Sequence, residues 1–194
     1  MLLDIPTQIE TGRLYLRCYR AGDGPWYYAA SQRNRTHLQR YEPDNVLMSI
    51  HSQQEAEIVV RELAAEWPAR NCFFMCAFER ATEEFVAQIY IGPVDWTLPE
   101  FAIGYFADVD HQGRGFVTEA VNAALGFCFE SLRARRIRIE CDDTNLRSRR
   151  VAERCGLIQE AHFRENRKPP DGTFSGTLCF GLLRSEQDPN TGVP

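Results

Sequence analysis

The sequence lacks the features that mark several large classes of protein. It has no excess of basic residues, since its net charge is −5, and this disfavours a nucleic-acid partner. It has no apolar run long enough to cross a bilayer, and its first residues, MLLDIPTQIE, lack the basic start and apolar core of a secretion signal. We therefore expect a cytoplasmic protein that binds neither nucleic acid nor membrane.

Metal-binding motifs are missing as well. The seven cysteines include no CxxC pair, and the four histidines include no HExxH spacing. An odd number of cysteines scattered through apolar segments is typical of reduced core residues. The sequence therefore predicts no bound metal, and it favours surface or turn positions for His111 and the other histidines.

A strand, a glycine turn and a helix follow one another in residues 101–121, FAIGYFADVDHQGRGFVTEAV. Residues 101–106 form an apolar run, and apolar residues from Val117 to Cys128 recur at helical spacing. Between them, Gly113 and Gly115 let the backbone approach a ligand closely. The first N–H groups of a helix lack internal partners and, with the helix dipole, favour an anion. We therefore predict a phosphate-binding turn; a tight connection without a ligand is the alternative.

The spacing of this turn excludes the two commonest nucleotide loops. It matches neither GxGxxG nor GxxxxGK[ST], and no lysine follows the second glycine. A nucleotide-binding domain is therefore disfavoured.

The remaining pattern predicts an α+β domain over residues 1–194. Strands are expected over residues 9–19, 72–78, 85–91, 101–106, 135–141, 157–164 and 174–183. A short helix is expected over residues 24–30 and a second short helix or turn over 33–41; longer helices are expected over 53–67 and 117–132, and a short basic helix over 145–154. Ser52 and Glu55 form a capping box, Pro68 stops the following helix, and Gly156 ends the last one. This order favours a sheet of about seven strands with helices on its faces, followed by a loose polar tail from Ser185.

Several separated segments resemble the GNAT N-acetyltransferases, in particular their RimJ/RimL-like branch, which acetylates the N-termini of ribosomal proteins. The turn QGRGFV resembles the family's acyl-CoA loop, Q/R-x-x-G-x-G/A, with Val117 where Gly or Ala is usual. Residues 9–17 (IETGRLYLR), 103–121, 142–157 (DDTNLRSRRVAERCGL) and 163–183 resemble the opening strand, central motif, last motif and closing hairpin of that branch. The resemblance covers nearly the whole chain, in the right order.

This resemblance implies a mixed, mostly antiparallel sheet with splayed central strands, acetyl-CoA as co-substrate and a primary amine as acceptor. The pantetheine arm would lie in the gap between the splayed strands, held by the backbone of Phe106, Ala107, Asp108 and Val109. The pyrophosphate would be held by Gln112, Gly113, Arg114, Gly115, Phe116 and Val117. Asn145 would contact the pantetheine region, and it is equally a helix N-cap with Ser148 at the third position.

The chemistry implied is attack of a neutral amine on a thioester, which calls for a base and a proton donor. Many relatives place a tyrosine donor seven residues beyond the motif asparagine, where this chain has Ala152. Ser148, which the RimL-like branch shares, is the substitute that we predict, and stabilisation of the first helical turn is its alternative role.

The base is the less defined of the two groups. Relatives often carry a glutamate where this chain has Ala102. Glu140 is our first choice because it lies near the end of the strand beside the expected gap. The other acidic candidates are Glu100, Asp108 and Asp142, and a water relay is an alternative to any of them.

The acceptor pocket is expected between the early helices and the closing hairpin, lined by Trp26, Tyr27, Arg35, Tyr41 and Trp96. An enzyme is not the only function that fits. The missing tyrosine, the missing glutamate and Val117 also fit a sensor or scaffold that binds acyl-CoA without turnover. The oligomeric state is left open between a monomer and a homodimer.

Overall fold

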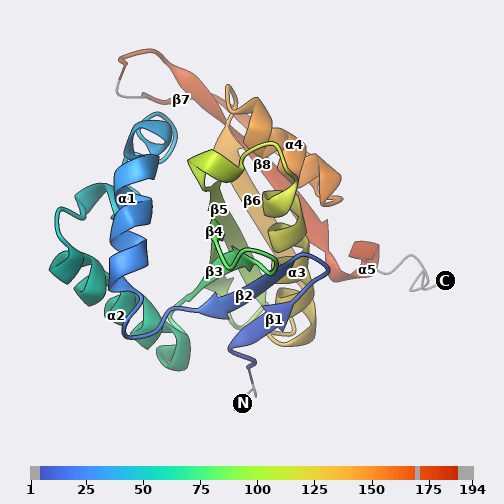
Figure 1. Ribbon diagram of the computed structural model, residues 1–194. Helices are drawn as coiled ribbons and strands as arrows, with labels where there is room; N and C mark the ends of the chain where they lie inside the picture. Colours follow the sequence, from blue (N-terminus) through green and yellow to red (C-terminus); the bar gives the residue numbers. More distant parts are fainter. Residues whose placement is uncertain (1–4, 169–170, 188–194) are drawn as a thin grey trace.

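The computed structural model describes residues 5–168 and 171–187, and within this part of the chain eight strands form one sheet. Their order across the sheet is β1-β2-β3-β4-β5-β6-β8-β7 (Figure 1). Neighbours are antiparallel except β5 and β6, which are parallel. The strands are Gln8–Glu10, Leu14–Cys18, Phe73–Glu79, Phe85–Asp95, Glu100–Ala107, Arg136–Asp142, Ile158–Arg167 and Ser175–Leu183, β1 to β8 in chain order. The mixed, mostly antiparallel sheet is confirmed, with one strand more than predicted.

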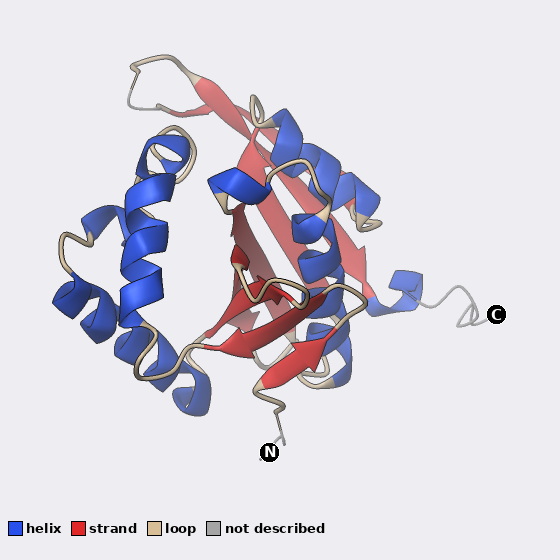
Figure 2. Cartoon of the chain, in the orientation of Figure 1, coloured by secondary structure: helices blue, strands red, loops and turns tan. Residues whose placement is uncertain are grey.

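Helices cover both faces of this sheet, as predicted (Figure 2). The two early helices, α1 (Gly24–Leu38) and α2 (Gln53–Ala69), lie on one face, and α3 (Phe116–Glu130) and α4 (Leu146–Arg154) lie on the other (Figure 1). Short pieces complete the described chain: the 3₁₀ turns η1 (Val46–Ser49) and η2 (Val109–His111), and α5 (Arg184–Gln187). No helix among the described residues combines the length and apolar character that crossing a membrane needs.

The extra strand comes from the first predicted one, which is a hairpin. The backbone N–H of Thr11 donates to the Leu14 carbonyl at 2.8 Å, and its hydroxyl oxygen accepts the Leu14 N–H at 2.9 Å. These bonds turn the chain at Gly12, between β1 and β2. Ile9 is out of phase with Leu14, Leu16 and Cys18, so the alternation changes phase at Thr11-Gly12, and this change was the available signal for the break.

Helix α1 is one helix where a short helix and then a second short helix or turn were predicted. Its polar residues Ser31 and Asn34 are fully buried, because they bond the backbone of the preceding turn and a polar group on the facing loop. A polar face that is buried looks the same in sequence as one that is solvated, and this hid the continuity of the helix.

The capping residue of α2 is confirmed. The Ser52 hydroxyl accepts the Glu55 N–H at 3.1 Å, and the Glu55 carboxylate accepts the N–H of His51 rather than that of Ser52. The helix continues one residue past Pro68 and ends where Arg70 takes a left-handed conformation. The predicted loose tail is wrong for residues 185–187, which belong to α5 and are held by a bond from the Leu183 N–H to Glu186; residues 188–194 lie outside the described chain.

The central strands splay, and the register shows how. Strand β5 pairs with β6 over three positions alone, Glu100–Ala102 against residues 136–138. Beyond them β5 stays paired with β4 as far as Ala107, while β6 stays paired with β8 as far as Asp142. Each strand is therefore held by its outer neighbour, and the two inner edges separate along residues 103–107 and 139–142. We call this gap the slit.

The apolar core lies on both sides of the sheet. One cluster packs α3 against β2 to β6 and β8, and it includes Phe101, Val121 and Ile139, all fully or almost fully buried. The second packs α1 and α2 against Tyr19, Cys76 and Phe106. Residues Phe101 and Ile103 of β5 belong to the first cluster, whereas Phe106 belongs to the second, so β5 presents a different face to each pair of helices.

Asp108 connects α1 to the turn that follows β5. Its side chain is completely buried, and its carboxylate accepts bonds from Arg33 Nε at 2.7 Å and Asn34 Nδ2 at 2.8 Å. The same carboxylate accepts the Asp110 N–H and contacts the His111 ring. Asn34 Oδ1 in turn accepts the Val109 N–H at 2.8 Å. This network fixes where the chain leaves the sheet to enter the glycine turn.

We expect Asp108→Ala to lower the free energy of unfolding by about 3 kcal/mol, because it leaves buried donors without a partner. The neighbouring substitution Asp110→Ala is the matched control and should change stability by less than about 0.5 kcal/mol, since the Asp110 side chain is 70% exposed. Urea unfolding followed by tryptophan fluorescence measures both. Equal losses in the two variants would contradict a special role for Asp108.

Candidate functional site

The turn between β5 and α3 offers free backbone donors. Gly113 and Gly115 adopt φ angles of 75° and 80°, which favour glycine, and Gly115 caps α3. The first internal bond of α3 runs from the Glu119 N–H to the Gly115 carbonyl at 3.1 Å. The N–H groups of residues 116–118 therefore have no partner within the helix. A Cβ atom placed on Gly113 would meet nothing within 4 Å, so the turn borders open space. This geometry suits an anion.

A cavity of about 570 Å³ lies beside the turn. It is bounded by the β1–β2 turn, the start of α3 and Arg154 at the end of α4. Arg13 lines it and is paired with Glu119 at 2.7 Å. It is wide open to solvent, so it is a depression of the surface rather than an enclosed pocket.

The side chains of the turn have partners of their own. Arg114 bonds Glu79 at 3.0 Å and stacks on the ring of Phe116, which is itself buried. Val117 packs against the core, so its side chain does not occupy the space in front of the turn. The predicted contribution of these residues to ligand binding is therefore through their backbone rather than their side chains.

Gln112 links three elements at the mouth of the slit. Its amide contacts the ring of His37 at the end of α1, at 3.0 Å, and its carbonyl oxygen accepts a bond from Arg147 on α4. Burial, and then the charge of Arg147, lower the pKa of His37 below its ordinary value. His37 is therefore neutral at pH 7, and it also lies against the Ala107 backbone.

The backbone along the slit is only partly engaged. The Asp108 N–H donates to the Val86 carbonyl at 2.9 Å, and the Val109 N–H is taken by Asn34. In an antiparallel pair the direction of the polar groups alternates, so Phe106 also faces β4, while Tyr105 and Ala107 face the slit. Of the four residues predicted to hold an arm in the slit, Ala107 is the one whose backbone points into it.

Ser148 and Tyr105 bring two hydroxyl groups together beside the slit. The Tyr105 hydroxyl lies 3.0 Å from Ser148 Oγ and 3.0 Å from the Ser148 carbonyl oxygen. Burial raises the pKa of the Tyr105 phenol well above its ordinary value, so it carries its proton at neutral pH. The Asn145 side chain accepts the Ser148 N–H at 3.2 Å, which makes Asn145 the N-cap of α4, as predicted. This cap fixes the serine opposite the tyrosine.

The acidic candidates for the base differ in how many bonds their carboxylates already accept and in how exposed they are. Asp142 is buried and accepts bonds from Thr144 and Ser175. The Asp108 carboxylate already accepts the bonds from Arg33, Asn34 and the Asp110 N–H described above. Glu100 pairs with Arg136 at 3.5 Å, where β5 and β6 are still joined. Glu140 is 42% exposed, and Arg138 lies 3.7 Å away.

The five residues predicted to line an acceptor pocket do not come together. Tyr27 is fully buried and donates to Gln88, so it is a core residue and cannot contact an acceptor. Trp96 follows β4 and packs on Phe101, in the half of β5 far from the glycine turn. Trp26 packs against Phe78 and Phe85, and it lines a second cavity beneath α1.

The other two predicted acceptor residues lie at the carboxyl end of α1. Arg35 donates to the Ile50 carbonyl at 2.6 Å. Tyr41 alone reaches the slit side, where its hydroxyl donates to the Thr144 carbonyl at 3.3 Å.

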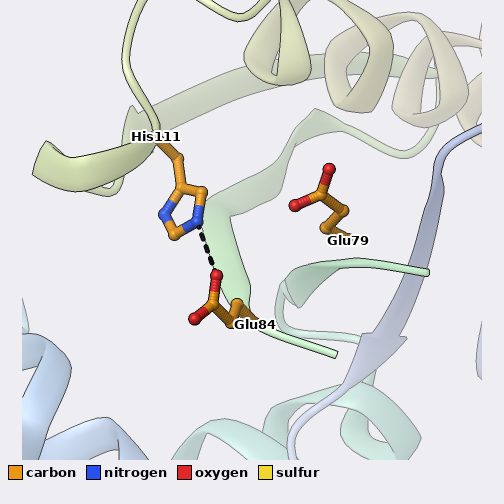
Figure 3. A group of neighbouring side chains, drawn as sticks. All are labelled: Glu79, Glu84 and His111. Atoms are coloured by element: carbon orange, nitrogen blue, oxygen red, sulfur yellow. Dashed lines mark hydrogen bonds and ion pairs between the residues drawn. The ribbon is translucent and has the colours of Figure 1, made fainter. Parts of the chain in front are cut away.

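Three residues could in principle supply metal ligands. Glu79, Glu84 and His111 bring one ligand atom each within 4.8 Å of one another, and His111 points toward Glu84 (Figure 3). A surface or turn position was predicted for His111: it does lie in the turn η2, but its ring is buried between Asp108 and Glu84 rather than at the surface. The charge of Glu79 is already matched by Arg114, so these contacts account for the cluster without a cation.

Sequence reasoning missed Tyr105 and His37. Tyr105 stands on the core-facing side of β5 with Phe101 and Ile103, and a single hydroxyl among apolar neighbours was the available signal. No such signal pointed to His37, because Gln112, which contacts its ring, and Arg147, whose charge lowers its pKa, are distant in the sequence.

Comparisons with known proteins agree with this geometry. A protein named Probable N-acetyltransferase YjcK, from Bacillus subtilis, is 41% identical over 86 residues, which are 44% of this chain and 47% of that protein. The ribosomal-protein-serine acetyltransferase of Escherichia coli is 40% identical over 58 residues, which are 30% of this chain and 32% of that protein. The chain thus matches about half or less of the length of these relatives.

A solved structure shows the likeness of fold. Mycobacterium smegmatis RimJ, in complex with CoA-disulfide, has a TM-score of 0.79 over 89% of this chain and 83% of its own, at 23% identity. The family described as Acetyltransferase (GNAT) domain matches residues 13–158, most of the chain. With its splayed central strands and its glycine turn at the head of a buried helix, the chain belongs to the GNAT acetyltransferase family.

Proposed function

We propose that this protein is an acetyl-CoA-dependent N-acetyltransferase that acts on a primary amine. The observation that carries the proposal is the slit between β5 and β6, which ends at a turn rich in unpaired backbone donors. The slit is open along one edge of β5, where an extended arm can pair as an added strand. The turn supplies the positive end of a helix dipole for a diphosphate.

The donor would lie along these two features. The pyrophosphate sits on the N–H groups of residues 113–118, and the pantetheine arm pairs with the backbone of Tyr105 and Ala107. The RimJ structure, which contains CoA, supports this class of ligand. Binding requires Gln112 to leave His37 or Arg147, because their contacts cross the mouth of the slit. Arg147 would then be free to meet a phosphate.

The hydroxyl pair of Tyr105 and Ser148 would protonate the departing thiolate. Many relatives carry a tyrosine on the helix at the position of Ala152, whereas here Tyr105 brings a phenol to Ser148 from the strand. An acidic residue on the opposite side of the slit would take the proton of the amine, and Glu140 is the sequence-based choice. The amine nitrogen forms a bond to the thioester carbonyl carbon, and the carbon–sulfur bond breaks.

The acceptor would be a protein N-terminus. The Escherichia coli relative is named for a ribosomal-protein acceptor, which favours an α-amine and a cytoplasmic site of action. An α-amine also titrates near pH 8 whereas lysine titrates near pH 10.4, so the α-amine needs less help from a base.

A sensor that binds acyl-CoA without turnover is the second candidate function. Val117, the missing tyrosine and the missing glutamate favoured it in the sequence. The first two arguments lose weight here, since Val117 packs inward and Tyr105 supplies a hydroxyl beside Ser148. The third still holds, because the position of that glutamate is Ala102.

Thiol release tests the proposed function directly. We expect acetyl-CoA with a panel of peptides that carry free α-amines to release free thiol faster than acetyl-CoA alone, and peptides with blocked N-termini and a free lysine to react more slowly. Binding of CoA by calorimetry, with no thiol release from any amine, would instead favour the sensor.

The glycine turn gives a second prediction. We expect Gly113→Ala to weaken CoA binding about tenfold, because the left-handed conformation costs an alanine about 1 kcal/mol and tilts the N–H donors. Gly126→Ala, within α3 and clear of neighbouring atoms, is the control and should leave CoA affinity unchanged. Calorimetry measures both variants. Unchanged affinity of the Gly113 variant would show that the turn does not hold the ligand.

The hydroxyl pair gives a third prediction. We expect Tyr105→Phe to lower kcat about 100-fold with little change in the KM for acetyl-CoA, since the proton donor acts only as the thiolate leaves. The control Tyr90→Phe, on the neighbouring β4, should keep wild-type rates. If one relay is involved, Tyr105→Phe with Ser148→Ala should be little slower than Tyr105→Phe alone. Additive losses would argue against a shared proton path.

A further inference from the structure

Most carboxylates near the slit are already committed to other bonds. Asp108 and Asp142 are buried and multiply bonded, and Glu100 pairs with Arg136 at the joined end of the strands. A base must exchange its proton with solvent and with an incoming amine, so these three are poor choices. The carboxylates that remain are Glu140 and one residue that the sequence did not single out, Glu42.

The segment that follows α1 reaches across the slit. Tyr41 donates to the Thr144 carbonyl at 3.3 Å and contacts its hydroxyl, and Thr144 directly precedes the cap residue of α4. The Glu42 N–H is fixed to the Leu38 carbonyl at 2.8 Å, and its carbonyl accepts the Asn45 N–H at 3.0 Å. The turn is therefore held at both ends, and it places Glu42 beside the start of the helix that carries Ser148.

The exposure and the pKa of Glu42 suit a group that exchanges protons with solvent. Solvent reaches its side chain, yet enough protein surrounds the carboxylate for desolvation to raise its pKa above the ordinary value. The groups that influence the pKa of its carboxylate are Asn45 and Asp44 from its own turn and Arg167 from the end of β7. Burial accounts for most of the raised pKa of Tyr105, and the negative charge of Glu42 makes a small further contribution.

We propose that Glu42 is the base that takes a proton from the acceptor ammonium, opposite the hydroxyl pair that serves the departing thiolate. This inference rests on the proposed function. The carboxylate accepts one proton from R–NH₃⁺ and passes it to solvent, which leaves a neutral amine. The amine nitrogen bonds to the thioester carbon. As the carbon–sulfur bond breaks, the second nitrogen-bound proton reaches the sulfur through Tyr105 and Ser148, giving an amide and a free thiol.

The same carboxylate would help to select the acceptor. A negative charge at the slit, with Arg167 behind it, favours a cationic amine over a neutral hydroxyl. The raised pKa brings the base nearer to that of an α-amine, so proton transfer is less uphill than it would be to an ordinary glutamate.

The test compares Glu42→Gln with Asp44→Asn and Glu140→Gln in thiol release with a peptide α-amine. We expect kcat/KM of Glu42→Gln to fall about 100-fold at pH 6.5, and the defect to shrink to less than about tenfold at pH 9, where the amine is neutral without help. Asp44→Asn, a matched carboxylate on the same turn, should stay within about twofold of wild type. CoA affinity by calorimetry should be unchanged in all three variants.

Each outcome decides the inference. A Glu42→Gln defect that is constant from pH 6.5 to pH 9, or that follows a loss of CoA affinity, would assign a structural role instead. Wild-type rates in Glu42→Gln with a large, pH-dependent defect in Glu140→Gln would move the base to β6. If wild-type protein released no thiol with any amine, the proposed function itself would fail, and this inference with it.

Discussion

The structure depends on two strands being held apart. Strand β5 is bonded along its whole length to β4, and β6 along its whole length to β8, so neither is free to close the gap between them. Where the two strands do pair, Phe101 and Ile137 sit in the core under α3 and fix the point of divergence. A slit of this kind leaves backbone N–H and C=O groups unpaired on both edges. Such edges persist only where something else can bond to these groups. An extended ligand arm is the simplest partner.

A second constraint places the glycine turn at the end of the slit. Asp108 is buried at the last position before the turn, and it ties Arg33 and Asn34 of α1 to the start of η2. The helix that covers one face of the sheet is thereby fastened to the loop that begins the helix on the other face. Because α1 also carries His37 toward the slit and leads into Glu42, the same network orients the proposed donor and acceptor sides relative to each other.

Local patterns predicted most of the fold, and polar contacts between distant segments explain most of what they missed. The capping residue Ser52, the glycine turn and the core-facing helix α3 are encoded within a few residues of one another, and all are found where expected. The buried polar face of α1 depends on bonds that a pattern does not display, whereas the break at Gly12 coincides with a change in the phase of the alternation.

The candidate site follows the same division. The glycine turn and the cap Asn145 could be predicted from local sequence, whereas Ser148 was singled out by the resemblance to the RimL-like branch. The aromatic residues Tyr27 and Trp96 were misplaced, since an aromatic side chain looks the same in sequence whether it packs in the core or lines a pocket. Glu42 was missed because its significance comes from Thr144, Arg167 and Tyr105, all more than 60 residues further along the chain.

The most direct test of this account is a crystal structure of the protein with CoA. The account predicts the diphosphate on the N–H groups of the glycine turn, the arm paired to the free edge of β5, and the sulfur within about 4 Å of the Tyr105 hydroxyl. CoA bound outside the slit, or a slit closed by pairing of β5 with β6 along residues 103–107, would contradict it.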